Sequence, residues 1–278
     1  MPIMVRKADG SSEPLDFNKI KRALRRAGAS GALCDEVVES LHEEMIEGIS
    51  TKKIYKLAFM KLREFKPGAA ARFGLKSSLF KFGPEGYPFE TFMGALLRGR
   101  GYETQVRQIV QGKCISHEID VVATRAKIEG HERTKSIIEC KFHNSPSIRC
   151  SIQSALYSWA RFLDIRERDT GIDSCWLATN TKFSSDVIRY ADCVGLKLLG
   201  WSFPRHESIQ VRIEENKLYP ITVIPKINKH EFYALHEAGV ITLKDLIACP
   251  IDELKKFGLR ENKIERLKEK AREIMARK

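Results

Sequence analysis

Two clusters of proline and glycine divide the 278-residue chain into three segments of different pattern. The first cluster is FGPEGYP at 82–88, and the second is YPITVIP at 219–225. Proline lacks a backbone N–H and glycine loosens the backbone, so such clusters interrupt regular structure. The chain is also long enough for two or three domains. We therefore expect three domains, at residues 1–83, 84–223 and 224–278.

The middle segment alternates helical and extended patterns. Apolar residues recur at helical spacing in 88–101, 151–165 and 184–195, and extended runs lie at 103–110, 114–124, 136–142, 175–180 and 196–202. This alternation predicts an α/β domain with a mixed sheet and flanking helices. Within it, the helix at 151–165 is expected to bury one apolar face, made of Ile152, Ala155, Leu156, Trp159 and Leu163.

One predicted strand, SIIECKF, carries charges in an apolar run. Side chains alternate across a strand, so Glu139 and Lys141 leave on one face and Ile138 and Cys140 on the other. Lys and Glu are rarely buried without a partner. The charged face therefore meets either solvent, as in an ordinary edge strand, or a ligand.

A second acid, Asp120, interrupts the β-branched run SHEIDVVAT upstream. Two neighbouring strands, one with Asp120 and the other with Glu139 and Lys141, can bring the three groups to one end of a sheet. Two carboxylates there suit Mg²⁺, and a lysine can orient water and neutralise charge that develops on a phosphate. The pattern indicates phosphodiester hydrolysis.

The order I-D and then E-C-K resembles the D…(D/E)-x-K signature of the restriction-endonuclease-like fold, and its surroundings are similar to the Mrr-type branch. The helix GALLRGRGYE resembles the opening helix of that branch, and SIQSALYSWA resembles a later helix that carries a glutamine beside the site. The resemblance covers about residues 85–203. It implies metal ligation by Glu90, Asp120 and Glu139, with Mg²⁺ or alternatively Mn²⁺, and a catalytic set of Glu90, Asp120, Glu139, Lys141 and Gln153. The family's Gly-Gly-x-Asp approach is replaced by His117-Glu118-Ile119-Asp120.

The spacing Cys114-x-x-His117 and Cys140-x-x-His143 raises the alternative of a structural zinc site. Cys140 falls on the apolar face of its strand, where a small core residue suffices, so zinc is disfavoured. His117 and His143 are proton-shuttle candidates, but a loop-end position without a chemical role is the simpler interpretation.

The N-terminal segment is basic and helical, with Asp16 or Asn18 capping a helix that Gly28 ends. VRKADGSSEPLDFNKIKRAL, GISTKKIYKLAFMKL and AAARFGL resemble the ATP-cone, a nucleotide-sensing module of ribonucleotide reductases and their repressor. The resemblance covers about 1–83 and implies that ATP or dATP binds, through Val5, Lys7, Glu13, Lys19 and Thr51. Ala8 stands where the family usually has arginine. A basic domain that binds DNA directly is the alternative.

The tail, from LHEAG to ERLKEKA, resembles helix-hairpin-helix modules, which offer helix N-termini to DNA phosphates. Residues 226–278 hold 13 Lys and Arg against 9 Asp and Glu, and the whole chain carries +12. A polyanionic partner is therefore expected. A bare interaction or dimerisation domain is the alternative for the tail.

Together these features predict a multidomain α/β chain: a restriction-endonuclease-like core, a mostly helical ATP-cone and an all-α C-terminal module. The predicted function is Mg²⁺-dependent DNA endonuclease, with DNA and an adenine nucleotide as partners. The alternatives are a nucleotide-responsive DNA-binding regulator and a DNA-end or junction binder without nuclease activity. Seven scattered cysteines and the lack of a long apolar stretch predict a cytoplasmic protein without membrane contact. Homo-oligomerisation is left open.

Overall fold

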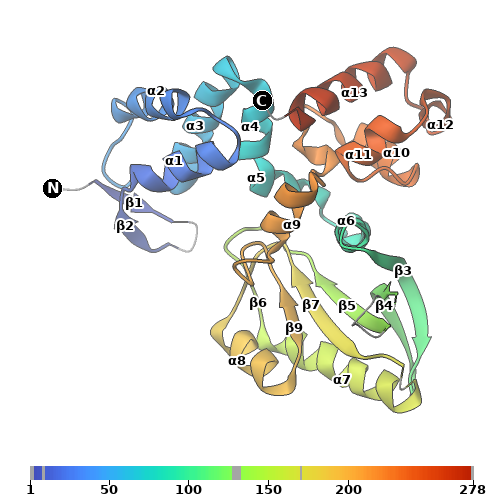
Figure 1. The fold of residues 1–278 in the computed structure, drawn as a ribbon. Coiled ribbons are helices and arrows are strands. Elements are labelled where there is room, and N and C mark those ends of the chain that lie inside the picture. Colours follow the sequence, from blue (N-terminus) through green and yellow to red (C-terminus); the bar gives the residue numbers. More distant parts are fainter. Residues whose placement is uncertain (1–2, 8–9, 127–132, 170, 277–278) are drawn as a thin grey trace. The chain divides into compact units, whose positions relative to one another are not determined.

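The computed structural model describes residues 3–7, 10–126, 133–169 and 171–276. They form two compact units. One comprises Leu79–Pro220 and Gly239–Asp245, and the other comprises Met1–Ser78, Ile221–Ala238 and Leu246–Lys278. Ala8, the departure from the ATP-cone pattern, lies outside the described residues. Figure 1 shows the elements of both units.

The larger unit is built on a five-stranded mixed sheet with the order β3-β4-β5-β7-β9. Its strands are β3 (Tyr102–Gln111), β4 (Ser116–Arg125), β5 (Thr134–Lys141), β7 (Ser174–Thr179) and β9 (Lys197–Leu199). The first three strands pair antiparallel, and β5, β7 and β9 pair parallel. This sheet confirms the predicted mixed α/β class.

Helices flank this sheet, as Figure 1 shows. Helix α6 (Tyr87–Arg98) packs against β3 and β4, and α7 (Ile152–Arg168) packs against β7 beside α8 (Ser185–Val194). One core joins the sheet to α7 and α8 through Ile119, Val122, Ile137, Phe162, Ile165 and Val187. The parallel pair β6 (Arg149–Cys150) and β8 (Lys182–Phe183) is too short to show a sequence period.

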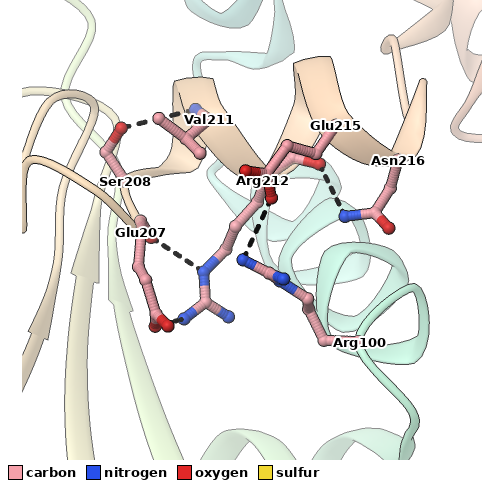
Figure 2. A network of polar contacts seen from close by, with 7 residues as sticks. All are labelled: Arg100, Glu207, Ser208, Val211, Arg212, Glu215 and Asn216. Atoms are coloured by element: carbon pink, nitrogen blue, oxygen red, sulfur yellow. Dashed lines mark hydrogen bonds and ion pairs between the residues drawn. The ribbon is translucent and has the colours of Figure 1, made fainter.

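Helix α9 (Ile209–Asn216) was not predicted, and a buried arginine anchors it. Arg212 is 4% exposed and donates from Nε and Nη2 to the backbone oxygen and Oε2 of Glu207, at 2.8 and 3.0 Å. Its guanidinium also lies over the Trp176 ring, and Arg100 pairs with Glu215 at 3.2 Å. Figure 2 shows the contacts of Arg212 with Glu207 and of Arg100 with Glu215. They stabilise a helix whose own apolar pattern is weak.

The strands around Asp120 are irregular. The β3–β4 register pairs Val106 with Val121 and Gln108 with Ile119, and between them Arg107 has φ 51°. This left-handed conformation is uncommon for a non-glycine residue and costs roughly 1–3 kcal/mol. The β4–β5 register ends at Val121 opposite Ile138. At Asp120, the regular pairing of β4 is thus interrupted on the β3 side and has ended on the β5 side.

The predicted buried face of α7 is partly wrong. Leu156 and Leu163 are 46% and 37% exposed, whereas the buried residues of the helix are Ala155, Ser158, Arg161, Phe162 and Ile165. The helix is rotated from the expected phase because Phe162 and Ile165 enter the sheet core. This rotation also turns Arg161 towards β5.

The other unit begins with a hairpin, β1 (Met4–Arg6) and β2 (Ser12–Pro14), followed by α1 (Phe17–Arg26), α2 (Gly31–His42), α3 (Thr51–Phe65) and α4 (Pro67–Phe73). Asp16 caps α1 by accepting from the Asn18 backbone N–H, which confirms that cap. Gly28, with φ 92°, follows the end of α1. After α4 the chain continues as α5 (Leu75–Leu79) and the short turn Phe80–Phe82.

The last helices are α10 (Lys229–Glu237), α11 (Leu243–Ala248), α12 (Ile251–Lys255) and α13 (Glu261–Met275). Helix α13 packs on α4. Buried Arg72 of α4 donates to the backbone oxygens of Ala27 and Ile274, and a Cβ at Gly68 would lie only 2.9 Å from the Glu273 oxygen. Most of the C-terminal segment therefore shares one compact unit with the N-terminal segment, whereas Gly239–Asp245 belong to the larger unit. The two predicted domain boundaries stay a prediction.

Candidate active site

Four predicted residues gather where β4 and β5 separate. Glu90 comes from the first turn of α6, Asp120 from β4, and Glu139 and Lys141 from β5. Burial raises the pKa of both Glu90 and Asp120, and the negative charge of Glu139 adds to both shifts, so the three carboxylates share one electrostatic site. The charge of Glu118 also raises the pKa of Glu90. The fifth predicted residue, Gln153, is exposed on the first turn of α7.

Asp120 lies at the centre of this group. Its Oδ2 accepts the backbone N–H of Cys140 at 2.6 Å, which ties β4 to β5 just beyond their last regular pair. Burial raises the pKa of the Asp120 carboxyl to about 7, and the charge of Glu139 adds to the shift. The bond from Cys140 opposes it without cancelling it. Asp120 is therefore held in a place that disfavours its own charge.

This shift predicts how stability depends on pH when no divalent ion is bound. The pKa of Asp120 is about 7 in the folded chain, against an ordinary value of 3.8. The folded state holds the extra proton between these values, so the free energy of unfolding falls as pH rises through this window. Asp120→Asn keeps an acceptor for Cys140 and has no proton to lose.

In EDTA, the wild type should therefore lose more thermal stability between about pH 5 and pH 8 than Asp120→Asn does. Melting curves of both proteins at the two pH values measure the difference. Equal losses would show that the carboxyl of Asp120 titrates near its ordinary pKa.

Glu139 is neutralised on both oxygens. Its Oε2 accepts from Arg161 Nη1 at 2.5 Å, and its Oε1 lies 3.5 Å from Lys141 Nζ. The side chains of Glu139 and Arg161 are only 10% and 9% exposed, whereas that of Lys141 is 42% exposed. Of the two cations that contact Glu139, Lys141 is thus the one that solvent or a ligand can reach.

Arg161 is the functional candidate that the sequence did not reveal. Its guanidinium also lies 5.1 Å from the centre of the Tyr157 ring, and its buried Nε has no hydrogen-bond partner among the described residues. Gln153, Tyr157 and Arg161 recur every four residues, so they share one face of α7. That spacing was a usable signal, but the apolar pattern of the helix concealed it.

Glu90 has its own cation. Arg107 Nη1 lies 3.9 Å from Glu90 Oε2 and donates to Thr91 Oγ1 at 3.4 Å. Burial raises the pKa of the Glu90 carboxyl, and Arg107 opposes the shift. Arg107 is the residue with the unusual positive φ beside Asp120, and no sequence pattern marks that conformation.

The pair Cys114 and His117 and the pair Cys140 and His143 contact different residues. His117 Nε2 lies 2.7 Å from Asp164 Oδ2, and Asp164 Oδ1 accepts the backbone N–H of Cys114 at 2.8 Å. Burial lowers the pKa of His143, and its backbone N–H donates to Asn180 Oδ1. These positions give the two Cys-x-x-His pairs no shared centre.

Across the residues that the structure describes, no three His, Cys, Asp or Glu side chains are arranged to hold a metal ion. The carboxylates of Glu90, Asp120 and Glu139 nevertheless supply the oxygen ligands that Mg²⁺ and Mn²⁺ prefer. Their mutual repulsion is the kind that a divalent cation relieves. The three carboxylates therefore fit such an ion by ligand type. In this structure, Arg107 pairs with Glu90 and Arg161 pairs with Glu139.

The predicted nucleotide-binding residues gather around Glu13 in the smaller unit. Glu13 Oε2 lies 3.6 Å from Lys7 Nζ, and its Oε1 lies 3.0 Å from Lys19 Nζ. Val5 pairs with Glu13 across the hairpin, and Thr51 begins α3. Arg6 bridges to Ser50, which places the start of α3 beside β1.

The Val5 side chain is 3% exposed and belongs to the core, and its backbone pairs with that of Glu13 across the hairpin. The bond from Lys19 lowers the pKa of the Glu13 carboxyl. Two lysines held by one acid can turn to phosphates instead, and all five residues stay predictions as nucleotide ligands.

No helix in the described part of the chain is long and apolar enough to cross a membrane.

Three families match successive parts of the chain. The ATP cone domain matches residues 3–75, a restriction endonuclease domain of the Mrr type matches 84–200, and the AF1548-like C-terminal domain matches 219–275. These matches confirm the resemblance to the ATP-cone and to Mrr-type nucleases. The helix-hairpin-helix character of the tail stays a prediction.

Individual proteins also align with parts of the chain. An uncharacterised protein of Archaeoglobus fulgidus is 41% identical over 184 residues, which cover 66% of this chain and 96% of that protein. The crystal structure of AF1548, a protein of unknown function, is 39% identical with a TM-score of 0.59, over 68% of this chain and 97% of that one. The transcriptional repressor NrdR of Dictyoglomus thermophilum is 35% identical over 80 residues, 26% of this chain and 53% of the repressor.

Proposed function

Because the chain belongs to the AF1548-like family and carries an Mrr-type restriction endonuclease domain, we propose that it is a Mg²⁺-dependent DNA endonuclease. ATP or dATP bound by the N-terminal cone would regulate it. The observation that carries the proposal is the gathering of Glu90, Asp120, Glu139 and Lys141 where β4 and β5 separate.

The three carboxylates of this group and its lysine have different tasks. Glu90, Asp120 and Glu139 would hold Mg²⁺, which supplies Lewis-acid activation of a phosphate and a water when bound. Lys141, exposed and beside Glu139, orients the attacking water and stabilises charge that develops on the phosphate. Arg161 holds the Glu139 carboxylate in position, and exposed Gln153 and Tyr157 offer a surface to the DNA strand.

The test is incubation of the purified full chain with supercoiled, linear and branched DNA. Each DNA form is combined with Mg²⁺, Mn²⁺ or EDTA, and with no nucleotide, ATP or dATP. Divalent-dependent strand breaks in at least one DNA form support the proposal. Their absence in every combination contradicts it.

One observation favours a second candidate, a nucleotide-responsive DNA-binding regulator that does not cleave. Arg161 neutralises Glu139 at 2.5 Å in a buried pair, and such a pair competes with a metal ion for the same oxygen. If it persists when DNA and Mg²⁺ are present, the nuclease fold serves binding alone. The same DNA panel, read by electrophoretic mobility as well as by strand breaks, separates the two functions.

The cone should bind an adenine nucleotide through its two paired lysines. Lys7→Ala combined with Lys19→Ala is expected to weaken ATP or dATP binding at least tenfold. Each lost charge-assisted contact costs about 1.5–3 kcal/mol. Isothermal titration calorimetry measures the change. The matched control is Lys56→Ala with Lys61→Ala, two lysines of α3 in the same domain. No nucleotide binding by the wild type, or an equal loss in the control, would contradict this role.

A further inference from the structure

A small basic pocket lies in the C-terminal helices, outside the nuclease domain. Its volume is about 110 Å³, and its lining consists of Pro225, Lys226, Lys263, Arg266, Leu267 and Lys270. Four of these six residues are cations, and none is acidic or aromatic. We infer that this pocket binds a phosphate group of the backbone of duplex DNA. The inference rests on the proposed action on DNA and assigns it a specific contact.

The charges of the pocket are largely uncompensated. Lys263 Nζ pairs with Glu231 Oε1 at 2.7 Å, and Glu231 Oε2 also accepts the Asn228 backbone N–H. Lys226, Arg266 and Lys270 form no ion pair with any residue in the described ranges. Three cations around one hollow, without an acid to balance them, attract an anion.

The spacing on α13 produces this grouping. Lys263, Arg266 and Lys270 stand at i, i+3 and i+7, so they share one face of the helix around the buried Leu267. Glu265 and Glu269 lie on another side of the same helix. An arginine on this face can bind phosphate oxygens bidentately, which a lysine cannot do.

Lys226 reaches the pocket through an unusual backbone conformation. Its φ is 62°, in the left-handed region, although the residue is an exposed lysine. A glycine would adopt this conformation without the steric penalty of a Cβ. Strained positions of this kind cluster at ligand sites, and this one places a cation on the rim.

The size of the pocket selects the ligand. Sites that enclose whole small molecules usually exceed roughly 300 Å³, so a volume of about 110 Å³ suits one phosphate group and not a nucleotide. The six lining residues also offer no aromatic ring on which a base could stack. Contacts to DNA phosphates position a protein without reading sequence, which is the task that this arrangement can perform.

The test uses the full chain, because α13 also packs on α4. Binding of a labelled DNA duplex is measured by fluorescence anisotropy in EDTA, between about 50 and 200 mM salt. For Arg266→Gln with Lys270→Gln, the slope of log K against log salt should become shallower by about 0.9 for each lost phosphate contact. The matched control is Arg272→Gln, an exposed arginine of the same helix that does not line the pocket.

Lys226→Gly gives an independent readout. It removes a cation and suits the positive φ, so the melting temperature should stay the same or rise while DNA affinity falls. Weaker binding in both pocket variants, with an unaffected Arg272→Gln, supports the pocket. An unchanged slope in the double variant, or an equal change in Arg272→Gln, overturns it.

Because binding is measured without divalent ions, this test is independent of cleavage. A shallower slope in a chain that cuts no DNA keeps the pocket and rejects the nuclease. Normal cleavage with an unchanged slope keeps the nuclease and rejects the pocket.

Discussion

Asp120→Asn is expected to abolish Mg²⁺-dependent DNA cleavage, with a rate at least about 10³-fold below that of the wild type. A group that organises charge at a reacting centre typically supplies about 10²–10³-fold by itself, and the charges of both other carboxylates of the site act on Asp120. Asparagine preserves the acceptor for the Cys140 N–H. The variant should therefore fold and bind DNA normally, so that binding and cleavage separate. Initial rates of strand scission measure the effect.

Glu118→Gln is the matched control. Glu118 is an exposed carboxylate on the same strand, two residues away, where a side chain points to the same face. It should cleave at close to the wild-type rate. If Asp120→Asn cuts DNA normally, Asp120 does not hold the metal ion at this site. If Glu118→Gln loses as much activity, Glu118, whose charge also acts on Glu90, belongs to the metal site as well.

Arg161→Met is expected to destabilise the protein by about 3 kcal/mol or more, because removal of one partner leaves a buried charge uncompensated. Glu139 would keep only Lys141, at 3.5 Å and with a side chain that is 42% exposed. The double variant Arg161→Met with Glu139→Gln should recover most of the loss, since it removes both charges. Urea unfolding of the three proteins measures the free energies.

Arg166→Met controls for the loss of an arginine from α7. Its guanidinium lies over the Phe162 ring at 5.0 Å, but the residue is exposed on the helix surface. It should cost less than about 1 kcal/mol, as surface substitutions usually do. Equal stabilities of Arg161→Met and Arg166→Met would mean that Glu139 does not need Arg161.

Mg²⁺ should act differently on the wild type and on Arg161→Met. If Mg²⁺ binds the oxygen that Arg161 holds in the wild type, it should raise the melting temperature of Arg161→Met more than that of the wild type. An equal effect of Mg²⁺ on both proteins would favour the regulator without nuclease activity.

Much of the fold could be predicted from the sequence because local residue patterns specify these helices and strands. The apolar, β-branched runs SHEIDVVAT and SIIECKF predicted β4 and β5, and Asp16 marked the start of α1. Helix α9 and the short strands β6 and β8 were missed, since their stability comes from contacts such as those of Arg212 with Glu207 and Trp176. The buried face of α7 was predicted with the wrong phase, because Leu156 and Leu163 satisfied the helical period equally well.

The sequence by itself determined which acids and lysines belong together: Asp120, Glu139 and Lys141 stand on strands whose order and alternation bring them to one end of a sheet. Only the tertiary structure decided what neutralises them. Arg161 lies 22 residues beyond Glu139, and Arg107 lies 17 residues beyond Glu90. Neither pair lies within one helix or strand, so no local periodic pattern joins the two partners. These partners follow from burial, because a carboxylate removed from water must find a cation or a proton wherever packing supplies one.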